Sequence, residues 1–356
     1  MTLAKIPSQV PLVGITELSP SRYTWLRDGC AYSFLLESSL RSYSGPSMLM
    51  PPVSFNNVIG TIIHKIFQLV NSRQLECSEE AITQEWVRLC HQHQENIKEQ
   101  YPTIRNVAIG DYDAMYDTID VAQVMCKGDA PNAGASHLLS HLNEHYIKID
   151  NLLKGSIDRI RPNADGYEIV DYKTGKIFSE DGNIKQEYVA QLNLYAYMLT
   201  EKENVNISGL VIIDRMGNEI PVPYYKDKKA IFFAQVSRLI KDINDAVAEN
   251  AIMQLCRPSE DNCNFCPCQH LCHHRIVSPD NPFHIIEGSV SRAWNNDQIS
   301  IQVDGAGEIV IAKLGVLGLG SLSNYVGKRL IFVNLLQIIE GELYNRCDKT
   351  AIYERV

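Results

Sequence analysis

The segments GSIDRI (155–160) and IVDYKTGK (169–176) decide the fold of this chain. Both are short runs rich in β-branched and aromatic residues, and the loop between them contains an Asp-Gly pair at 165–166. Asp-Gly between two such runs is typical of the tight turn of a β-hairpin. The sequence therefore predicts a pair of antiparallel strands over 152–161 and 167–173.

Three charged residues of this hairpin are expected to share one face of the sheet. Side chains alternate along a strand, so Asp171 and Lys173 point to the same side, and the turn brings Asp158 across from them. Two carboxylates are suitable ligands for Mg²⁺ or Mn²⁺, which prefer oxygen. Such ions polarise a phosphodiester and activate water, and a lysine beside them stabilises the developing negative charge.

Helical and strand-like periodicity organises the rest of residues 1–282 into an α/β pattern. Residues 103–150 are expected to be helical in large part. Further helices are predicted over 19–36, 57–70, 78–98, 185–201 and 229–252, and further strands over 208–214 and near 219–224.

Three more polar residues lie at positions that fit a site next to the hairpin. His64 is on the helix that precedes the sheet, and Gln191 and Tyr195, four residues apart, share one face of the helix that follows it. Taken singly, each is more typical of ordinary packing or of a solvated helix face.

The order and spacing of these motifs resemble those of RecB-like nucleases in the PD-(D/E)XK superfamily. The resemblance covers roughly residues 15–275 and rests on Gly60-x-x-x-His64, Gly155-x-x-Asp158-Arg159-Ile160, Asp171-Tyr172-Lys173-Thr174-Gly175 and Gln191-x-x-x-Tyr195. It implies a restriction-endonuclease-like core with an N-terminal helical region. It also implies that Asp158 and Asp171 bind metal, that His64 adds a ligand, that Lys173 is catalytic, and that Gln191 and Tyr195 contact DNA.

Cysteine usage indicates a second metal site. The chain has 10 cysteines, and CNFCPCQHLC (263–272) holds four of them. Scattered cysteines, such as the other six, are usually small buried hydrophobic residues, whereas a dense cluster is usually a metal site. Disulfides are uncommon in the reducing cytoplasm, where we expect the protein to reside.

The spacing of these cysteines is similar to that of iron–sulfur members of the RecB-like group, such as the AddB nuclease domain and CRISPR-associated RecB-like exonucleases. The resemblance implies a structural [4Fe–4S] cluster bound by Cys30 before the core and by Cys263, Cys266 and Cys272 after it. The alternative is Zn²⁺, which would be held by the last three together with Cys268 or a nearby histidine (His270, His273 or His274).

The pattern of apolar and polar residues changes beyond Pro282. Residues 283–356 show strand-like alternation and predict a small all-β barrel of the oligonucleotide-binding (OB) type. Its acidic and basic residues nearly balance, so binding to DNA and docking to a partner protein both stay open. We expect two domains, 1–282 with a helical insertion at about 74–150, and 283–356.

Net charge, apolar segments and phosphate-binding motifs limit the possible functions. A net charge of −9 and a pI near 5.6 argue against a general nucleic-acid coat protein but not against a nuclease, which needs only a local basic groove. The N-terminus lacks the apolar run of a signal peptide, and no run of eighteen apolar residues predicts a membrane span. The chain has no Walker-type phosphate-binding motif, so ATP-driven unwinding would need a helicase or another DNA-processing partner.

These observations predict a Mg²⁺- or Mn²⁺-dependent deoxyribonuclease. We expect an exonuclease that acts on single strands or DNA ends, and the resemblance to RecB-like nucleases implies a setting in repair, recombination or antiviral defence. The alternative is a non-catalytic DNA-binding subunit, with a nuclease fold, of a helicase–nuclease complex.

Overall fold

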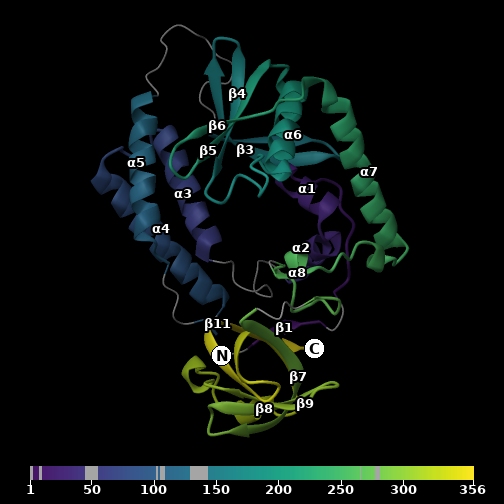
Figure 1. The fold of residues 1–356 in the computed structure, drawn as a ribbon. Coiled ribbons are helices and arrows are strands. Elements are labelled where there is room, and N and C mark those ends of the chain that lie inside the picture. The colour runs from purple at the N-terminus through teal and green to yellow at the C-terminus, as the bar shows by residue number, and fades with distance from the viewer. Residues whose placement is uncertain are drawn as a thin grey trace.

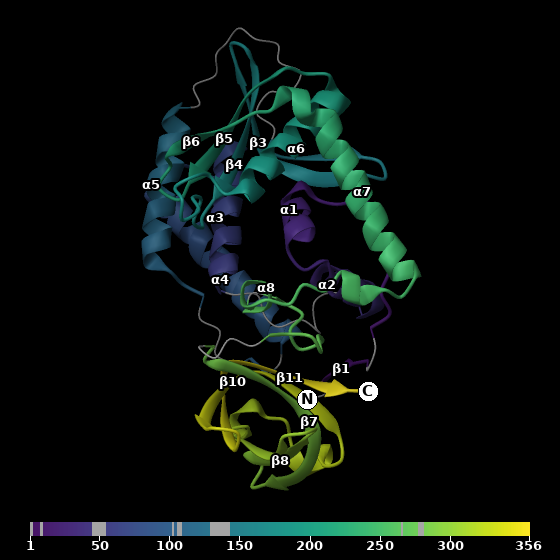
Figure 2. The same cartoon turned by 45° about the vertical axis from the view of Figure 1, so that its right-hand side comes forward.

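The structure is a computed structural model that describes residues 3–7, 10–44, 55–101, 103–104, 109–128, 143–264, 266–276 and 281–356. It contains a mixed sheet covered by helices and a second, strongly curved sheet at the opposite end of the molecule (Figure 1). Both chain ends lie beside the second sheet (Figures 1 and 2). Within the described residues, no helix is both long enough and apolar enough to cross a membrane.

The first sheet contains the predicted hairpin. Its strand order is β2 (Asn143–Ile149), β3 (Leu153–Asn163), β4 (Gly166–Lys173), β5 (Ile207–Asp214) and β6 (Glu219–Val222). β3 and β4 pair antiparallel, as expected, while β4 and β5 run parallel and are connected by α6 (Gln186–Glu203). The parallel pair requires a crossover, and α6 supplies it.

Helices cover both faces of this sheet (Figure 1). On one face lie α1 (Pro20–Asp28), α6 and α7 (Lys229–Ala248); on the other lie α3 (Phe55–Asn71), α4 (Glu79–Gln100) and α5 (Tyr112–Gly128). Successive residues of β4 divide between two cores, with Ile169 packed on the α6 side and Val170 on the α3 side. This alternation fixes which side chains of the hairpin face α6.

The prediction of a single helix over 19–36 was wrong. The chain forms α1 and then α2 (Ala31–Ser44), with a break at Gly29, whose backbone is extended and whose N–H donates to the Trp25 carbonyl at 2.8 Å. A Cβ on Gly29 would lie 2.5 Å from that carbonyl oxygen, so only glycine fits this turn.

The prediction that 103–150 is largely helical holds only for α5. Residues 143–149 form β2, an edge strand paired with β3 from Asn143 opposite Arg159 to Ile149 opposite Leu153. Residues 129–142, also in that prediction, lie outside the described residues.

The second sheet closes on itself. It consists of β7 (Phe283–Trp294), β8 (Gln298–Val303), β9 (Gly307–Ala312), β10 (Arg329–Ile339) and β11 (Leu343–Arg355), and β9 also pairs in parallel with β11. A short N-terminal strand, β1 (Ala4–Ile6), extends this sheet by pairing with β11. The domain boundary after residue 282 stays a prediction, but β1 belongs to the C-terminal sheet.

The cysteine-rich segment lies between α2 and the second sheet. Leu36 and Leu40 of α2 pack with Cys268, Leu271 and residues of β10 and β11 in one apolar cluster. α8 (Glu260–Asn264) begins this segment; the remaining short elements are the 3₁₀ turns η1 (Lys226–Lys228), η2 (Ile252–Gln254), η3 (Gly315–Leu317) and η4 (Leu322–Tyr325).

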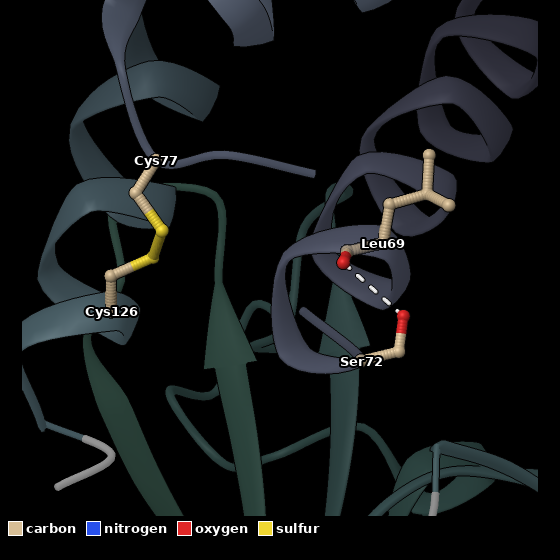
Figure 3. Close-up of a disulfide and its surroundings, with 4 residues drawn as sticks. All are labelled: Leu69, Ser72, Cys77 and Cys126. Atoms are coloured by element: carbon tan, nitrogen blue, oxygen red, sulfur yellow. Dashed lines mark hydrogen bonds between the residues drawn. A yellow bond between two sulfur atoms is a disulfide. The ribbon is translucent and has the colours of Figure 1, made fainter. Parts of the chain in front are cut away.

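Two of the scattered cysteines are bonded to each other. Cys77, just before α4, and Cys126, in the last turns of α5, form a disulfide across 49 positions of sequence (Figure 3). The same view shows the end of α3, where the Ser72 hydroxyl donates to the Leu69 carbonyl at 3.2 Å. The expectation that the scattered cysteines are only small hydrophobic residues was wrong for this pair.

Candidate active site and cysteine pocket

The hairpin brings both carboxylates and the lysine together: Asp171 and Lys173 face α6, where each contacts Gln191, and Asp158 is close to Asp171 and to α3. Asp158 comes from β3, and Asp171 and Lys173 come from the end of β4. His64 reaches the group from α3, with its Nδ1 3.5 Å from Asp158 Oδ2. The structure therefore brings together the four residues that the sequence proposed as catalytic or metal-binding.

Gln191 links the second carboxylate to the lysine. Its Nε2 donates to Asp171 Oδ1 at 3.0 Å, and its Oε1 accepts from Lys173 Nζ at 3.3 Å. Lys173 Nζ also lies 2.6 Å from Asp171 Oδ2. Burial lowers the pKa of Lys173, but the nearby carboxylates raise it by more, so its pKa lies above the usual value and the side chain is a cation.

The surroundings of Asp158 disfavour its ionised form. Burial raises its pKa to about 6, and the negative charge of Asp171 acts in the same direction; His64 and the Tyr172 backbone partly oppose the change. The Tyr172 N–H donates to Asp158 Oδ2 at 3.0 Å, which holds the carboxylate in place. Burial and the adjacent carboxylate thus both oppose the ionisation of Asp158.

Tyr195 lies close to Asp158, Asp171 and Gly155, and the missing side chain of Gly155 leaves space for its hydroxyl. A Cβ at Gly155 would lie 2.8 Å from the Tyr195 hydroxyl and 3.2 Å from Cδ of Pro20. Burial raises the pKa of Tyr195, and so do the charges of Asp171 and Asp158. Tyr195 and Gln191, which the sequence proposed as DNA contacts, are both buried in the structure.

The glycine of the histidine motif also has a steric role. A Cβ at Gly60 would lie 3.0 Å from Thr174 Oγ1, in the loop that follows Lys173. α3 thus approaches the end of β4 closely, and His64, one helical turn after Gly60, lies beside Asp158.

The donor set suits a hard divalent cation. Asp171 Oδ2 is buried and contacts the Lys173 amine at 2.6 Å, and a carboxylate oxygen with one such partner retains a further lone pair for a cation. Within the described part of the chain, no three or more His, Cys, Asp or Glu side chains converge on one point that could hold a metal. Mg²⁺ needs only one or two protein carboxylates, because it retains water and binds substrate phosphate. Asp158 and Asp171 meet that requirement.

A second group of side chains forms a pocket between α2 and the cysteine-rich segment. Its lining includes five thiols, from Cys30, Cys256, Cys263, Cys266 and Cys272. Cys256 had no place in the sequence prediction, because no ligand spacing marks it; its nearness to the cluster in sequence was the available signal.

The thiols of this pocket lie close together. Burial raises the pKa of Cys256 to about 12, and the adjacent Cys272 and Cys30 contribute in the same direction. A metal centre in this pocket would have to offset this resistance to ionisation, because the thiolate is the form that binds metal. Cys268 does not line the pocket: it is fully buried, with its Sγ 3.5 Å from the Ser33 carbonyl.

Comparison with known proteins identifies the fold family. The family model described as "PD-(D/E)XK nuclease superfamily" matches residues 17–273. Among solved structures, one titled "Crystal structure of SSO0001" aligns at 15% identity over 64% of this chain and 99% of that chain, with a TM-score of 0.28. No curated protein sequence matches the chain. Because the family model spans most of the chain, including both motifs of the hairpin, the protein belongs to the PD-(D/E)XK nuclease superfamily.

Proposed function

We propose that the protein is a RecB-like deoxyribonuclease that uses Mg²⁺ or Mn²⁺ to hydrolyse phosphodiester bonds. One observation carries the proposal: Asp158, Asp171 and Lys173 lie close together at the hairpin, and Asp171 contacts both Lys173 and Gln191. The superfamily match supports a nuclease, and DNA is the substrate that this fold implies. An exonuclease acting on single strands or free ends, in repair, recombination or defence, is the form we favour.

The roles follow from the contacts. Asp158 and Asp171 would hold the cation; His64, whose Nδ1 lies 3.5 Å from Asp158 Oδ2, would have to turn toward the cation to become a further ligand. When bound, such a cation polarises the phosphodiester and lowers the pKa of a bound water. Lys173 provides a fixed positive charge for the phosphate oxygen that gains charge in the transition state. Gln191 connects the two residues, because it accepts a hydrogen bond from Lys173 and donates one to Asp171.

We further propose that the cysteine pocket binds a [4Fe–4S] cluster through Cys30, Cys263, Cys266 and Cys272. A cluster distributes its thiolates over several iron atoms, so the four sulfurs need not converge on one point as they would for Zn²⁺. Cys30 precedes the core and the other three follow it, and thus the metal would connect distant parts of the chain. We assign the cluster a structural role.

The second sheet supports an OB-type barrel. Its five strands close in the order β7-β8-β9-β11-β10, with β9 and β11 parallel. We propose that this barrel contacts the DNA or docks a DNA-processing partner such as a helicase.

The proposal is tested with end-labelled single- and double-stranded DNA, incubated with Mg²⁺ or Mn²⁺ under anaerobic conditions. Asp171→Ala and Lys173→Ala should each reduce cleavage by at least about 100-fold. The exposed carboxylate of Asp165, in the turn of the same hairpin, provides the control variant Asp165→Asn, which should cleave normally. Full activity in both site variants would overturn the assignment of the site. DNA binding by the unaltered protein without cleavage under either metal would overturn the nuclease proposal.

A further inference from the structure

Tyr188 lies beside the candidate active site, and no motif of the sequence singles it out. It is in the first turn of α6, three residues before Gln191, so both side chains lie on the same face of the helix. The ring is half-buried, and its centroid is 5.0 Å from Lys173 Nζ. A second lysine, Lys185, has its Nζ 5.8 Å from the same centroid.

The Tyr188 ring is a third neighbour of the Lys173 ammonium group, besides Asp171 and Gln191. Asp171 Oδ2 lies 2.6 Å from Nζ and Gln191 Oε1 lies 3.3 Å from it, and the Tyr188 ring is the apolar neighbour. An aromatic face attracts a cation within about 6 Å of its centroid, and the attraction grows when water is excluded. The Lys173 side chain is only 18% exposed, so the contact lies in a largely dry environment.

The contact with Asp171 does not by itself fix the position of this amine. A lysine side chain is flexible, and a cation held by Asp158 and Asp171 would compete with Lys173 for the Asp171 carboxylate. The contact with the ring is independent of that carboxylate, so it persists when Asp171 is engaged elsewhere.

We propose that Tyr188 is a positioning residue, whose ring holds the amine of Lys173 at the scissile phosphate while Asp171 binds the cation. This inference rests on the proposed nuclease function for its kinetic consequence. The contact itself does not depend on that function, so the two are tested separately.

The contact is tested by nuclear magnetic resonance on the full-length protein, with lysine labelled with carbon-13 at the ε-carbon. Protons that lie over an aromatic ring resonate upfield, and the signal of Lys173 is identified by its loss in Lys173→Met. The upfield signal should persist in Tyr188→Phe and move to the range of the other lysines in Tyr188→Leu. An unchanged signal in Tyr188→Leu would overturn the inference whether or not the protein cleaves DNA.

The kinetic consequence is tested with the same variants. Tyr188→Leu should lower kcat about 3- to 30-fold with KM nearly unchanged, and Tyr188→Phe should restore the rate because it retains the ring. Tyr116, an exposed tyrosine on α5, provides the control Tyr116→Leu, which should cleave normally. A raised KM with unchanged kcat in Tyr188→Leu would overturn the positioning role, because the ring would then contact DNA. If Tyr188→Leu matches the unaltered protein while Lys173→Met is inactive, this inference fails and the proposed function stands.

Discussion

Replacement of Asp158 by asparagine should stabilise the metal-free protein while it abolishes cleavage. Burial and the neighbouring Asp171 raise the pKa of Asp158 from 3.8 to about 6. A carboxyl group whose pKa is higher in the folded state stabilises the fold only while it is protonated. That stability is complete below pH 3.8 and is lost as the pH rises through about 6.

The magnitude follows from the two pKa values. At 1.36 kcal/mol per pKa unit, the difference corresponds to about 3 kcal/mol of lost stability at pH 8. The Asp158 side chain is 23% exposed, and screening by water reduces this value. We expect Asp158→Asn to be about 2 kcal/mol more stable than the unaltered protein at pH 8, and about half of that at pH 5. The asparagine oxygen still accepts the hydrogen bond from the Tyr172 N–H, so the local structure should persist.

Urea unfolding in the presence of a chelator of divalent cations, at pH 5 and pH 8, measures this difference. The control Asp165→Asn changes an exposed carboxylate and should shift the free energy of unfolding by less than about 0.5 kcal/mol. Addition of Mg²⁺ should stabilise the unaltered protein and leave Asp158→Asn unchanged, because a ligand stabilises only the state that binds it. A stability difference that is the same at both pH values, or a less stable variant at pH 8, would refute the electrostatic account.

Three further changes test the packing and the cysteines. Gly155→Ala should lower the free energy of unfolding by about 1–3 kcal/mol, because its methyl group would lie 2.8 Å from the buried hydroxyl of Tyr195. The control Gly175→Ala, whose methyl group would have no atom within 4 Å, should lower it much less. Equal losses in the two variants would contradict the steric argument. Cys263→Ser should lose bound iron in metal analysis while Cys268→Ser retains it, and retention of iron by both would count against the pocket. Cys77→Ser should expose one additional alkylatable thiol on mass spectrometry of the denatured, unreduced protein, since it releases its disulfide partner; no additional thiol would show that the bond is absent.

The parts of the fold that follow from local chemistry were predictable. The hairpin was predicted from its turn and its alternation, and the same alternation placed Asp171 and Lys173 on one face. Helical periodicity predicted the bounds of α3, α4 and α6 to within a few residues. It also predicted the start of α7, but it placed the end of that helix four residues too late. In each case the deciding signal lies within a few residues of the element.

The parts that depend on distant contacts were not predictable. Helical periodicity continues through Gly29, and only the folded chain shows that Gly29 has an extended backbone, in which a side chain would clash with the preceding turn. β2 depends on pairing with β3, and β1 on pairing with a strand at the other end of the chain. Membership of Cys256 in the pocket likewise requires the folded chain, because its spacing from Cys263 matches no ligand pattern.

The proposed nuclease function depends on the two carboxylates of the hairpin, which would hold a divalent cation. The most direct test is a crystal structure of the protein with Mn²⁺, with data collected at a wavelength where manganese scatters anomalously. The account predicts an anomalous peak within coordination distance of both Asp158 and Asp171, and its loss from Asp171→Ala. A peak elsewhere, or none at these carboxylates at a saturating concentration of Mn²⁺, would contradict it.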